Sequence, residues 1–169
     1  MVVKVVHEER YWYPDDGGQV WIAGYTPVAE DGRYLARDAP ELTARGLQVA
    51  SVAGAARHHA QALETEAAAP GRPLELRRDP GNEHDPNAIM VLAGGEVIGF
   101  VPRELAAKLA GELDAGRPWS AAVLREQRPS PRDPRSGLTM LLAADASVSF
   151  VTWRPTTSSQ RTRPPSGST

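Results

Sequence analysis

Short apolar runs bounded by turn-forming residues recur along the chain, and at residues 47–53 and 74–78 apolar and polar positions alternate, which is the pattern of half-buried β-strands. The predicted strands span residues 2–6, 20–23, 47–53, 74–78, 88–92, 97–101 and 119–126, and the apolar runs 138–144 and 148–153 add a final strand or strand pair. Turn-forming residues separate many of these runs, as Gly94 and Gly95 do between the two strands of a predicted hairpin. The pattern therefore predicts a mainly β protein.

Two segments favour helices instead. Residues 56–68 are rich in alanine and glutamate, which have high helix propensity. Residues 102–115 begin with Pro102, which suits the start of a helix. Leucine recurs there at every fourth position, at Leu105, Leu109 and Leu113. We expect this second helix to follow directly after a strand and to bury its three leucines.

Composition divides the chain into four predicted segments. They are an aromatic-rich N-terminal extension (1–46), a central domain (47–127), a turn-rich segment whose final strand or strands pack on that domain (128–153), and a tail (154–169). The extension holds six of the ten aromatic residues, and we expect it to pack on the domain and add strands, because Trp12 and Trp21 are costly to leave in water. The tail has no aliphatic or aromatic side chain apart from proline, and we expect it to be disordered when free.

Composition and charge also exclude several classes of protein. The 169 residues include no cysteine, which excludes disulfides, thiol catalysis and cysteine-ligated zinc. No run of about 18 apolar residues exists, so no segment is predicted to span a membrane. The first residues, MVVKVVHEERYWY, lack the apolar stretch of a secretory signal, and a cytoplasmic location is expected. A net charge of −2 excludes a basic protein that coats nucleic acid.

Three motifs in the central domain resemble one known family. Residues 74–89, LELRRDPGNEHDPNAI, resemble the signature of the HIRAN domain, in which a strand leads into an Arg-(Glu/Asp)-Pro loop with spaced Asn and Asp and a closing Asn-Ala-Ile. Residues 52–54, VAG, resemble its first strand and glycine, and residues 97–106, VIGFVPRELA, resemble its passage from strand to helix. The resemblance extends over residues 49–126.

The resemblance implies a fold and a function. The fold is a small OB-like six-stranded β-barrel with two helices (α+β), here with an N-terminal β extension. The family occurs in fork-remodelling helicases, where it captures the free 3′ end of single-stranded DNA, and as stand-alone proteins in bacteria. The chain has no Gly-x-x-x-x-Gly-Lys-(Ser/Thr) phosphate loop, so no ATPase motor is expected. The resemblance implies a non-catalytic module for DNA 3′ ends in repair or replication-fork processing, without metal or cofactor.

The resemblance also implies where a DNA end would bind. Asp85 falls at the position that accepts a hydrogen bond from the terminal 3′-hydroxyl, and a carboxylate there repels a 3′-phosphate. Asn82 falls at a position that contacts the terminal nucleotide, and Arg57 and Arg103 fall at positions near its base and backbone. The predicted nucleic-acid-binding residues are Asp85, Asn82, His84, Arg57, Arg103, Arg77, Arg78 and Phe100.

Some of these positions depart from the family pattern. Arg57 and His84 stand where the DNA-binding members have aromatic residues that stack on bases, and Phe100 stands where those members have a histidine that touches phosphate. Each lost stacking contact predicts roughly tenfold weaker binding. Arg77 and Arg78 are candidates for phosphate contacts because of their charge, but neighbours on a strand face opposite sides and cannot both point into one groove.

Other interpretations remain open from the residues alone. Asp85, followed by Pro86 and Asn87, is also a natural loop closer through an Asx-turn. The chain could be a protein-interaction or scaffold module that keeps the fold without binding DNA ends, with residues 1–46 contacting a protein partner. A metal-dependent hydrolase would have to use His58, His59 and Asp85, but no His-Glu-x-x-His spacing and no Gly-x-Ser-x-Gly elbow exists. We therefore expect no enzyme activity.

Overall fold

The computed structural model describes residues 1–14 and 17–155, apart from the side chain of Ala56, so the predicted tail lies almost wholly outside the described residues. The strands are β1 (Val2–Trp12), β2 (Val20–Pro27), β3 (Leu47–Ser51), β4 (Pro73–Arg78), β5 (Ile89–Ala93), β6 (Glu96–Phe100), β7 (Ser120–Arg128), β8 (Gly137–Ala143) and β9 (Ser149–Thr152). The helices are α1 (Pro40–Ala44), α2 (Ala55–His58), α3 (Ala60–Leu63) and α4 (Arg103–Asp114), with a 3₁₀ turn η1 (Glu66–Ala68). The expectation of a mainly β protein with few helices is confirmed. No helix in the described part is long and apolar enough to cross a membrane.

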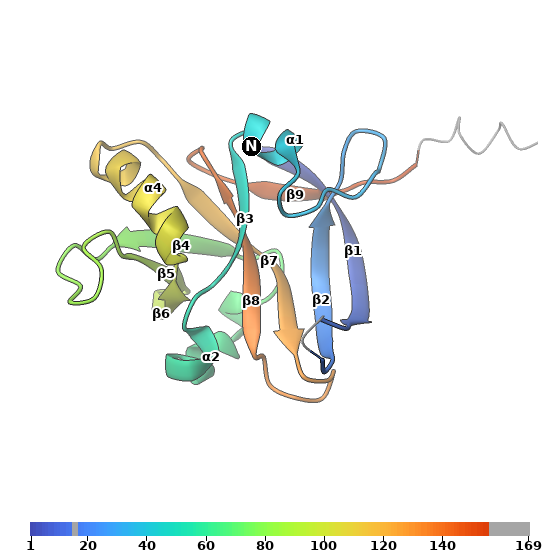
Figure 1. Cartoon of the computed structure of the whole chain (residues 1–169). Helices are drawn as coiled ribbons and strands as arrows, with labels where there is room; N and C mark the ends of the chain where they lie inside the picture. The colour runs from blue at the N-terminus through green and yellow to red at the C-terminus, as the bar shows by residue number, and fades with distance from the viewer. Residues whose placement is uncertain (15–16, 156–169) are drawn as a thin grey trace, which may run out of the picture.

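The sheet is built around β7. One edge of β7 pairs with β4 near its start and with β2 near its end, while the other edge pairs with β8. The strand order is β6-β5-β4-β7-β2-β1-β9, and β3 pairs with the outer edge of β8. Figure 1 shows β7 and β8 at the centre, with β1 and β2 on one side and β4, β5, β6 and α4 on the other.

The nine strands form an open sheet, and the expected closed six-stranded barrel is not confirmed. The chain after β3 meets β6 at one isolated bridge in the described residues, between Ala53 and Phe100. The two backbone N–H groups of this pair each donate to the other residue's carbonyl oxygen, at 2.8 and 2.9 Å. The pairing stops there because the chain leaves the extended conformation at Gly54 and begins α2.

The single helix expected over residues 56–68 is wrong. The chain forms α2, α3 and η1 instead, with a break at His59 (φ −135°, ψ 32°) and an extended residue at Thr65. Leu63 and Ala68 are both fully buried in the same core. In one straight helix these residues would point about 140° apart, so only a broken helix can bury both.

Two apolar clusters lie on opposite faces of β7 and β8. Leu138, Met140 and Leu142 belong to the larger cluster, which also receives α4. Leu141 and Ala143 belong to the smaller cluster on the other face. Because β8 is covered on both faces, its sequence is a continuous apolar run rather than an alternating one.

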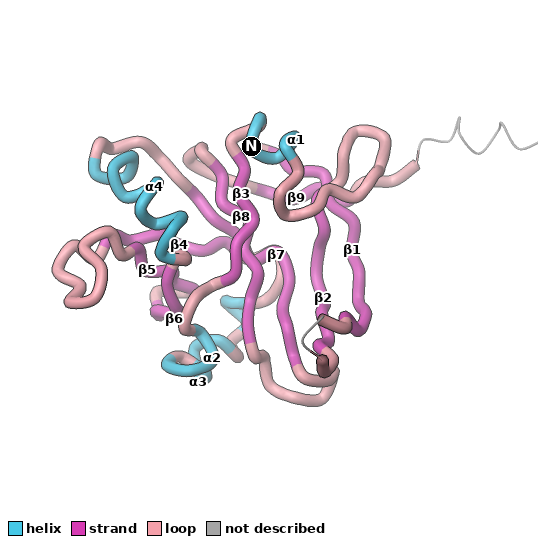
Figure 2. Tube along the Cα trace, in the orientation of Figure 1, coloured by secondary structure: helices cyan, strands magenta, loops and turns pink. Residues whose placement is uncertain are grey.

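The N-terminal extension adds strands to the sheet, as expected. β1 and β2 form an antiparallel hairpin, and Val3 and Val5 of β1 are buried in the smaller cluster. The expected burial of Trp12 is wrong, since 49% of this residue is exposed. Trp12 lies at the turn end of the hairpin, where it pairs with Val20 of β2. Figure 2 shows this end of the hairpin leading into a loop.

Candidate nucleic-acid interface

The loop between β4 and β5, residues 79–88, is closed by its own backbone hydrogen bonds. The N–H group of Asp79 donates to the carbonyl oxygen of Ala88 (2.9 Å), and that of Ala88 donates to the carbonyl oxygen of Asp85 (3.1 Å). The N–H group of Asn82 donates to the carbonyl oxygen of Asp79 (3.1 Å). The backbone of the 79–88 loop is therefore an ordered unit, and Figure 2 shows it as a loop next to β4 and β5.

The side chain of Asn82 organises this loop. Its Oδ1 atom accepts hydrogen bonds from the backbone N–H groups of His84 (2.9 Å) and Asp85 (3.1 Å). Its Nδ2 atom donates to Oδ2 of Asp79 (3.1 Å). The carbonyl end of the amide is thus used within the loop, and an N–H of Nδ2 is the part left for a ligand.

Asp85 combines a structural and a free oxygen. Its Oδ1 atom accepts a hydrogen bond from the backbone N–H of Asn87 (2.9 Å), so the expected Asx closure of the loop is confirmed. Within residues 1–14 and 17–155 its Oδ2 atom has no hydrogen-bond partner. One carboxylate therefore holds the loop and also offers an acceptor to a ligand.

A cavity of about 260 Å³ opens beside the loop, and we call it the loop cavity. It is lined by Ala53, Asn82, His84, Asp85, Ala88, Phe100, Val101 and Arg103. The fold thus brings together five of the eight predicted binding residues from three separate places: the 79–88 loop, the end of β6 and the start of α4. The bridge between Ala53 and Phe100 forms part of its wall.

Arg103 is placed by the passage from β6 into α4. The helix begins at Arg103, one residue later than predicted, with Pro102 as its N-cap, and the carbonyl oxygen of Pro102 accepts the N–H of Ala106 (2.8 Å). Leu109 is buried, while Leu105 and Leu113 are partly buried against the same core. The side chain of Arg103 is exposed and makes no ion pair or hydrogen bond with any described residue. It is the cation of the loop cavity that is free to meet a phosphate.

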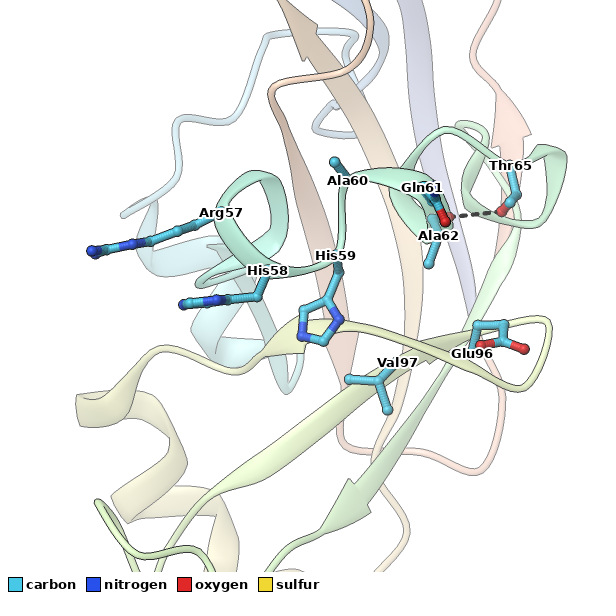
Figure 3. Close-up of a pocket in the computed structure, with 9 residues that line it drawn as sticks. All are labelled: Arg57, His58, His59, Ala60, Gln61, Ala62, Thr65, Glu96 and Val97. Carbon is cyan, nitrogen blue, oxygen red and sulfur yellow. Dashed lines mark hydrogen bonds between the residues drawn. The ribbon is translucent and has the colours of Figure 1, made fainter.

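The other three predicted arginine positions lie elsewhere. Arg57 lines a separate cavity with His58 and His59, and Figure 3 shows its side chain extending outward next to that of His58. Arg77 is exposed and pairs with Glu75 at 3.0 Å. The two neighbours Arg77 and Arg78 face opposite sides of β4, as expected.

Arg78 holds the 79–88 loop in place through hydrogen bonds to its backbone. Its guanidinium donates to Oδ1 of Asp114 (2.9 Å), to the carbonyl oxygen of Ala88 (2.7 Å) and to that of Pro86 (3.0 Å). It joins the end of α4 to the second half of the loop. Its donors are used in holding the cavity wall in place.

His58 and His59 do not line the same cavity as Asp85. His58 and His59 line the cavity of Figure 3, whereas Asp85 lines the loop cavity, so these three residues do not form the site that a metal-dependent hydrolase would need. Among the described residues no group of three or more His, Cys, Asp or Glu side chains could hold a metal ion.

Three small or apolar lining residues were not predicted as part of the site. Ala53, Ala88 and Val101 each lie inside one of the three motifs, but their side chains carry no chemistry that a sequence reveals. Only their positions in the sequence could have indicated a role in the site, because each is next to a predicted polar residue or at the end of a predicted strand.

The comparisons with known proteins point to one family. The model of the HIRAN domain family matches residues 46–137. The crystal structure of the HIRAN domain of human HLTF is similar to this chain, with 25% sequence identity and a TM-score of 0.42 over 58% of this chain and 76% of that chain. None of the curated proteins compared with the chain matches it. The family match contains every residue that lines the loop cavity.

Proposed function

We propose that this chain, which belongs to the HIRAN domain family, is a non-catalytic module that binds the 3′ ends of single-stranded DNA. The family match covers more than half of the chain and supports a DNA-binding module in general. The preference for a free 3′-hydroxyl, and a role in repair or replication-fork processing, are the finer parts of the proposal. Residues 47–127 would be the binding domain, with residues 1–46 and 128–153 as its additions.

One observation carries the proposal: the free Oδ2 atom of Asp85 and the unpaired guanidinium of Arg103 line the same cavity. A terminal 3′-hydroxyl is a donor that a carboxylate accepts strongly, and a 3′-phosphate in its place would meet like charge. Arg103 would bind a backbone phosphate of the terminal nucleotides. Asp85 would thus bind the terminal hydroxyl, and Arg103 would bind the backbone of the strand next to it.

The cavity walls supply a surface for a base. His84 is exposed at the rim, and Phe100 is partly buried in the wall. Both rings can stack on a base, which does not depend on the base sequence. The site contains one carboxylate and one guanidinium, so its own charges nearly balance. We therefore expect recognition of the end to depend more on the hydroxyl contact than on attraction of the phosphate backbone.

The test compares three single strands of equal length and sequence: one with a 3′-hydroxyl, one with a 3′-phosphate and one closed into a circle. The parent protein should bind the hydroxyl strand most tightly. Asp85→Asn keeps an oxygen that can accept the Asn87 N–H but removes the charge. It should lower affinity for the hydroxyl end by about 1.5–3 kcal/mol, the usual value for a hydrogen bond to a charged group, and shrink the discrimination against 3′-phosphate.

Three outcomes would overturn the proposal. If the parent binds all three strands equally, the cavity does not recognise ends. If a folded Asp85→Asn variant keeps the full preference for the hydroxyl, Asp85 is only the loop closer. If none of the three strands binds, the protein-interaction module becomes the better interpretation of the same fold.

A further inference from the structure

A second concave site lies outside the loop cavity, between the β1–β2 hairpin and the centre of the sheet. It has a volume of about 550 Å³, and we call it the hairpin pocket. Its charged and aromatic lining residues are Glu8, Arg10, Trp12, Tyr34, Arg37 and Arg125. Residues 8, 10 and 12 are alternate positions of β1 and so point to one face of the sheet. The N-terminal extension therefore forms most of this pocket.

The hairpin pocket carries excess positive charge. Three guanidinium groups line it with a single carboxylate, that of Glu8, although the whole chain has a net charge of −2. Glu8 is already engaged: it accepts a hydrogen bond from Oγ1 of Thr26 (2.8 Å) and lies 3.5 Å from Nε of Arg10. The side chain of Arg37 makes one long hydrogen bond, to Oγ of Ser51 (3.4 Å). The pocket thus holds more cationic charge than its own residues neutralise.

Arg125 is the innermost of these cations. Burial lowers the pKa of its guanidinium, Glu8 raises it, and Arg37 and Arg10 lower it further. An arginine remains protonated in spite of such shifts, because its ordinary pKa is far above neutrality. Since folding has already removed much of its water, an anion that enters the pocket gains a stronger interaction than it would at an exposed arginine.

The position of Arg125 is fixed by the backbone. The ladder between β7 and β8 is irregular between Val123 and Arg125. Across the other edge of β7, a Cβ atom on Gly24 would lie 2.5 Å from the Cα atom of Arg125. Glycine at this point lets β2 approach the irregular stretch, and Nη1 of Arg125 donates to the carbonyl oxygen of Tyr25 (3.1 Å). The cation therefore sits on rigid strands before any ligand arrives.

Two exposed aromatic rings border the same pocket. Trp12 is 49% exposed and Tyr34 is 57% exposed, which is unusual for side chains that gain so much from burial. Aromatic rings beside arginines are the combination that binds single-stranded nucleic acid, where bases stack on the rings and phosphates meet the cations. Neither ring belongs to the family match, which begins at residue 46.

We propose that the hairpin pocket binds a nucleotide unit of single-stranded nucleic acid, with a phosphate at Arg37 and Arg125 and a base on Trp12 or Tyr34. The site is separate from the loop cavity and needs no free end. Arg37 and Ser51 also line a smaller groove of about 310 Å³ that reaches Pro102, the neighbour of Arg103. A single strand of nucleic acid would follow this groove from the hairpin pocket to the loop cavity. This path between the two sites is the part of the inference that rests on the proposed function.

The experiment measures affinity for a labelled circular oligothymidylate, which has no 3′ end. Trp12→Ala and Arg37→Gln should each weaken binding of the circle about tenfold or more. Arg37→Gln should also reduce the slope of log affinity against log salt by about 0.7. Tyr13→Ala is the matched control, because Tyr13 is the next residue, is also exposed and does not line the pocket. Arg132→Ala is the corresponding control for an exposed arginine outside the pocket.

A second arm uses thymidine monophosphate as competitor, to separate a strand from a free nucleotide. The proposal requires the circle to bind much more tightly than the monophosphate. Equal affinity for both would make this a mononucleotide site and overturn the commitment to a strand, as would folded Trp12→Ala and Arg37→Gln variants that bind like the parent. No binding of the circle by the parent also overturns it. Failure of end recognition looks different: the circle still binds, but hydroxyl and phosphate ends bind alike.

Discussion

Gly99 lies so close to Ala53 that a Cβ atom added to Gly99 would come within 2.5 Å of the Ala53 carbonyl oxygen. The φ angle of Gly99 is also +154°, which residues with a side chain rarely adopt. This close approach permits the two hydrogen bonds between Ala53 and Phe100, and both residues line the loop cavity. The glycine of the Ile-Gly-Phe motif is therefore a requirement of the cavity wall.

Replacing this glycine should destabilise the protein. Gly99→Ala should lower the free energy of unfolding by about 1–3 kcal/mol through backbone strain and overpacking. Gly111→Ala is the control: Gly111 is exposed within α4, and an added Cβ meets no atom within 4 Å. That substitution should stabilise by about 0.4–1 kcal/mol. Urea unfolding measures both, and equal effects of the two changes would contradict the steric argument.

Arg78 should matter for stability and Arg77 should not. Arg78→Met removes hydrogen bonds to Asp114, Ala88 and Pro86 from a largely buried side chain and should cost about 1.5–3 kcal/mol. Arg77→Met breaks only an exposed pair with Glu75 and should change stability by less than about 0.5 kcal/mol. Thermal unfolding of the two variants checks this, and a similar loss in both would refute the anchoring role.

Acid should destabilise the protein in part through Glu126. Burial raises the pKa of its carboxyl, but hydrogen bonds from Arg128 and Arg135 outweigh that effect and hold the pKa below its ordinary value. Its stabilisation is therefore complete above the unfolded pKa of about 4.3 and is lost as the pH falls through the lower folded pKa. Glu126→Gln should flatten the dependence of the urea midpoint on pH below about 5, and an unchanged curve would rule this out.

The N-terminal extension should be part of the stable fold. Deleting residues 1–46 removes β1 and β2, exposes one edge of β7 and takes β1 away from β9, so the melting temperature should fall or the protein should not fold. Val5→Ala is a milder change at a fully buried position and should cost about 1–3 kcal/mol. Val2→Ala, on the same strand but exposed, is its control. An unchanged melting temperature after deletion would show that the extension is an independent element.

Substitutions of Arg103 and Asp85 should change DNA binding in different ways. Arg103→Ala removes a phosphate contact, so it should weaken binding of hydroxyl and phosphate ends alike and reduce the salt slope by about 0.7. Asp85→Asn should change only the preference among ends. Fluorescence anisotropy at several salt concentrations separates the two patterns. A loss confined to the hydroxyl strand in Arg103→Ala would assign Arg103 to the terminal hydroxyl instead.

Local structure could be predicted from the order of the residues. β6 and α4 follow from the apolar run at residues 97–101 and the leucines of residues 102–115, because both patterns extend over only a few residues. The hydrogen bond from the Asn87 N–H to Asp85 was predictable for the same reason, since it joins residues two apart. The motifs around these elements also indicated the family and five residues that line one cavity.

The contacts between segments that are distant in the sequence became known only from the tertiary structure. Arg78 and Arg103 are the same residue type, but one is used by Asp114 and two loop carbonyls while the other is free in the cavity, and no local pattern distinguishes them. The sheet stays open because β3 and β6 share one bridge, and residues 56–68 break because two buried positions face different ways on a straight helix. The hairpin pocket depends on Trp12 and Arg125, which are more than a hundred residues apart and are brought together by pairing of β1 with β2 and of β2 with β7. These contacts between distant residues set the environment of each side chain, and local sequence patterns do not reveal them.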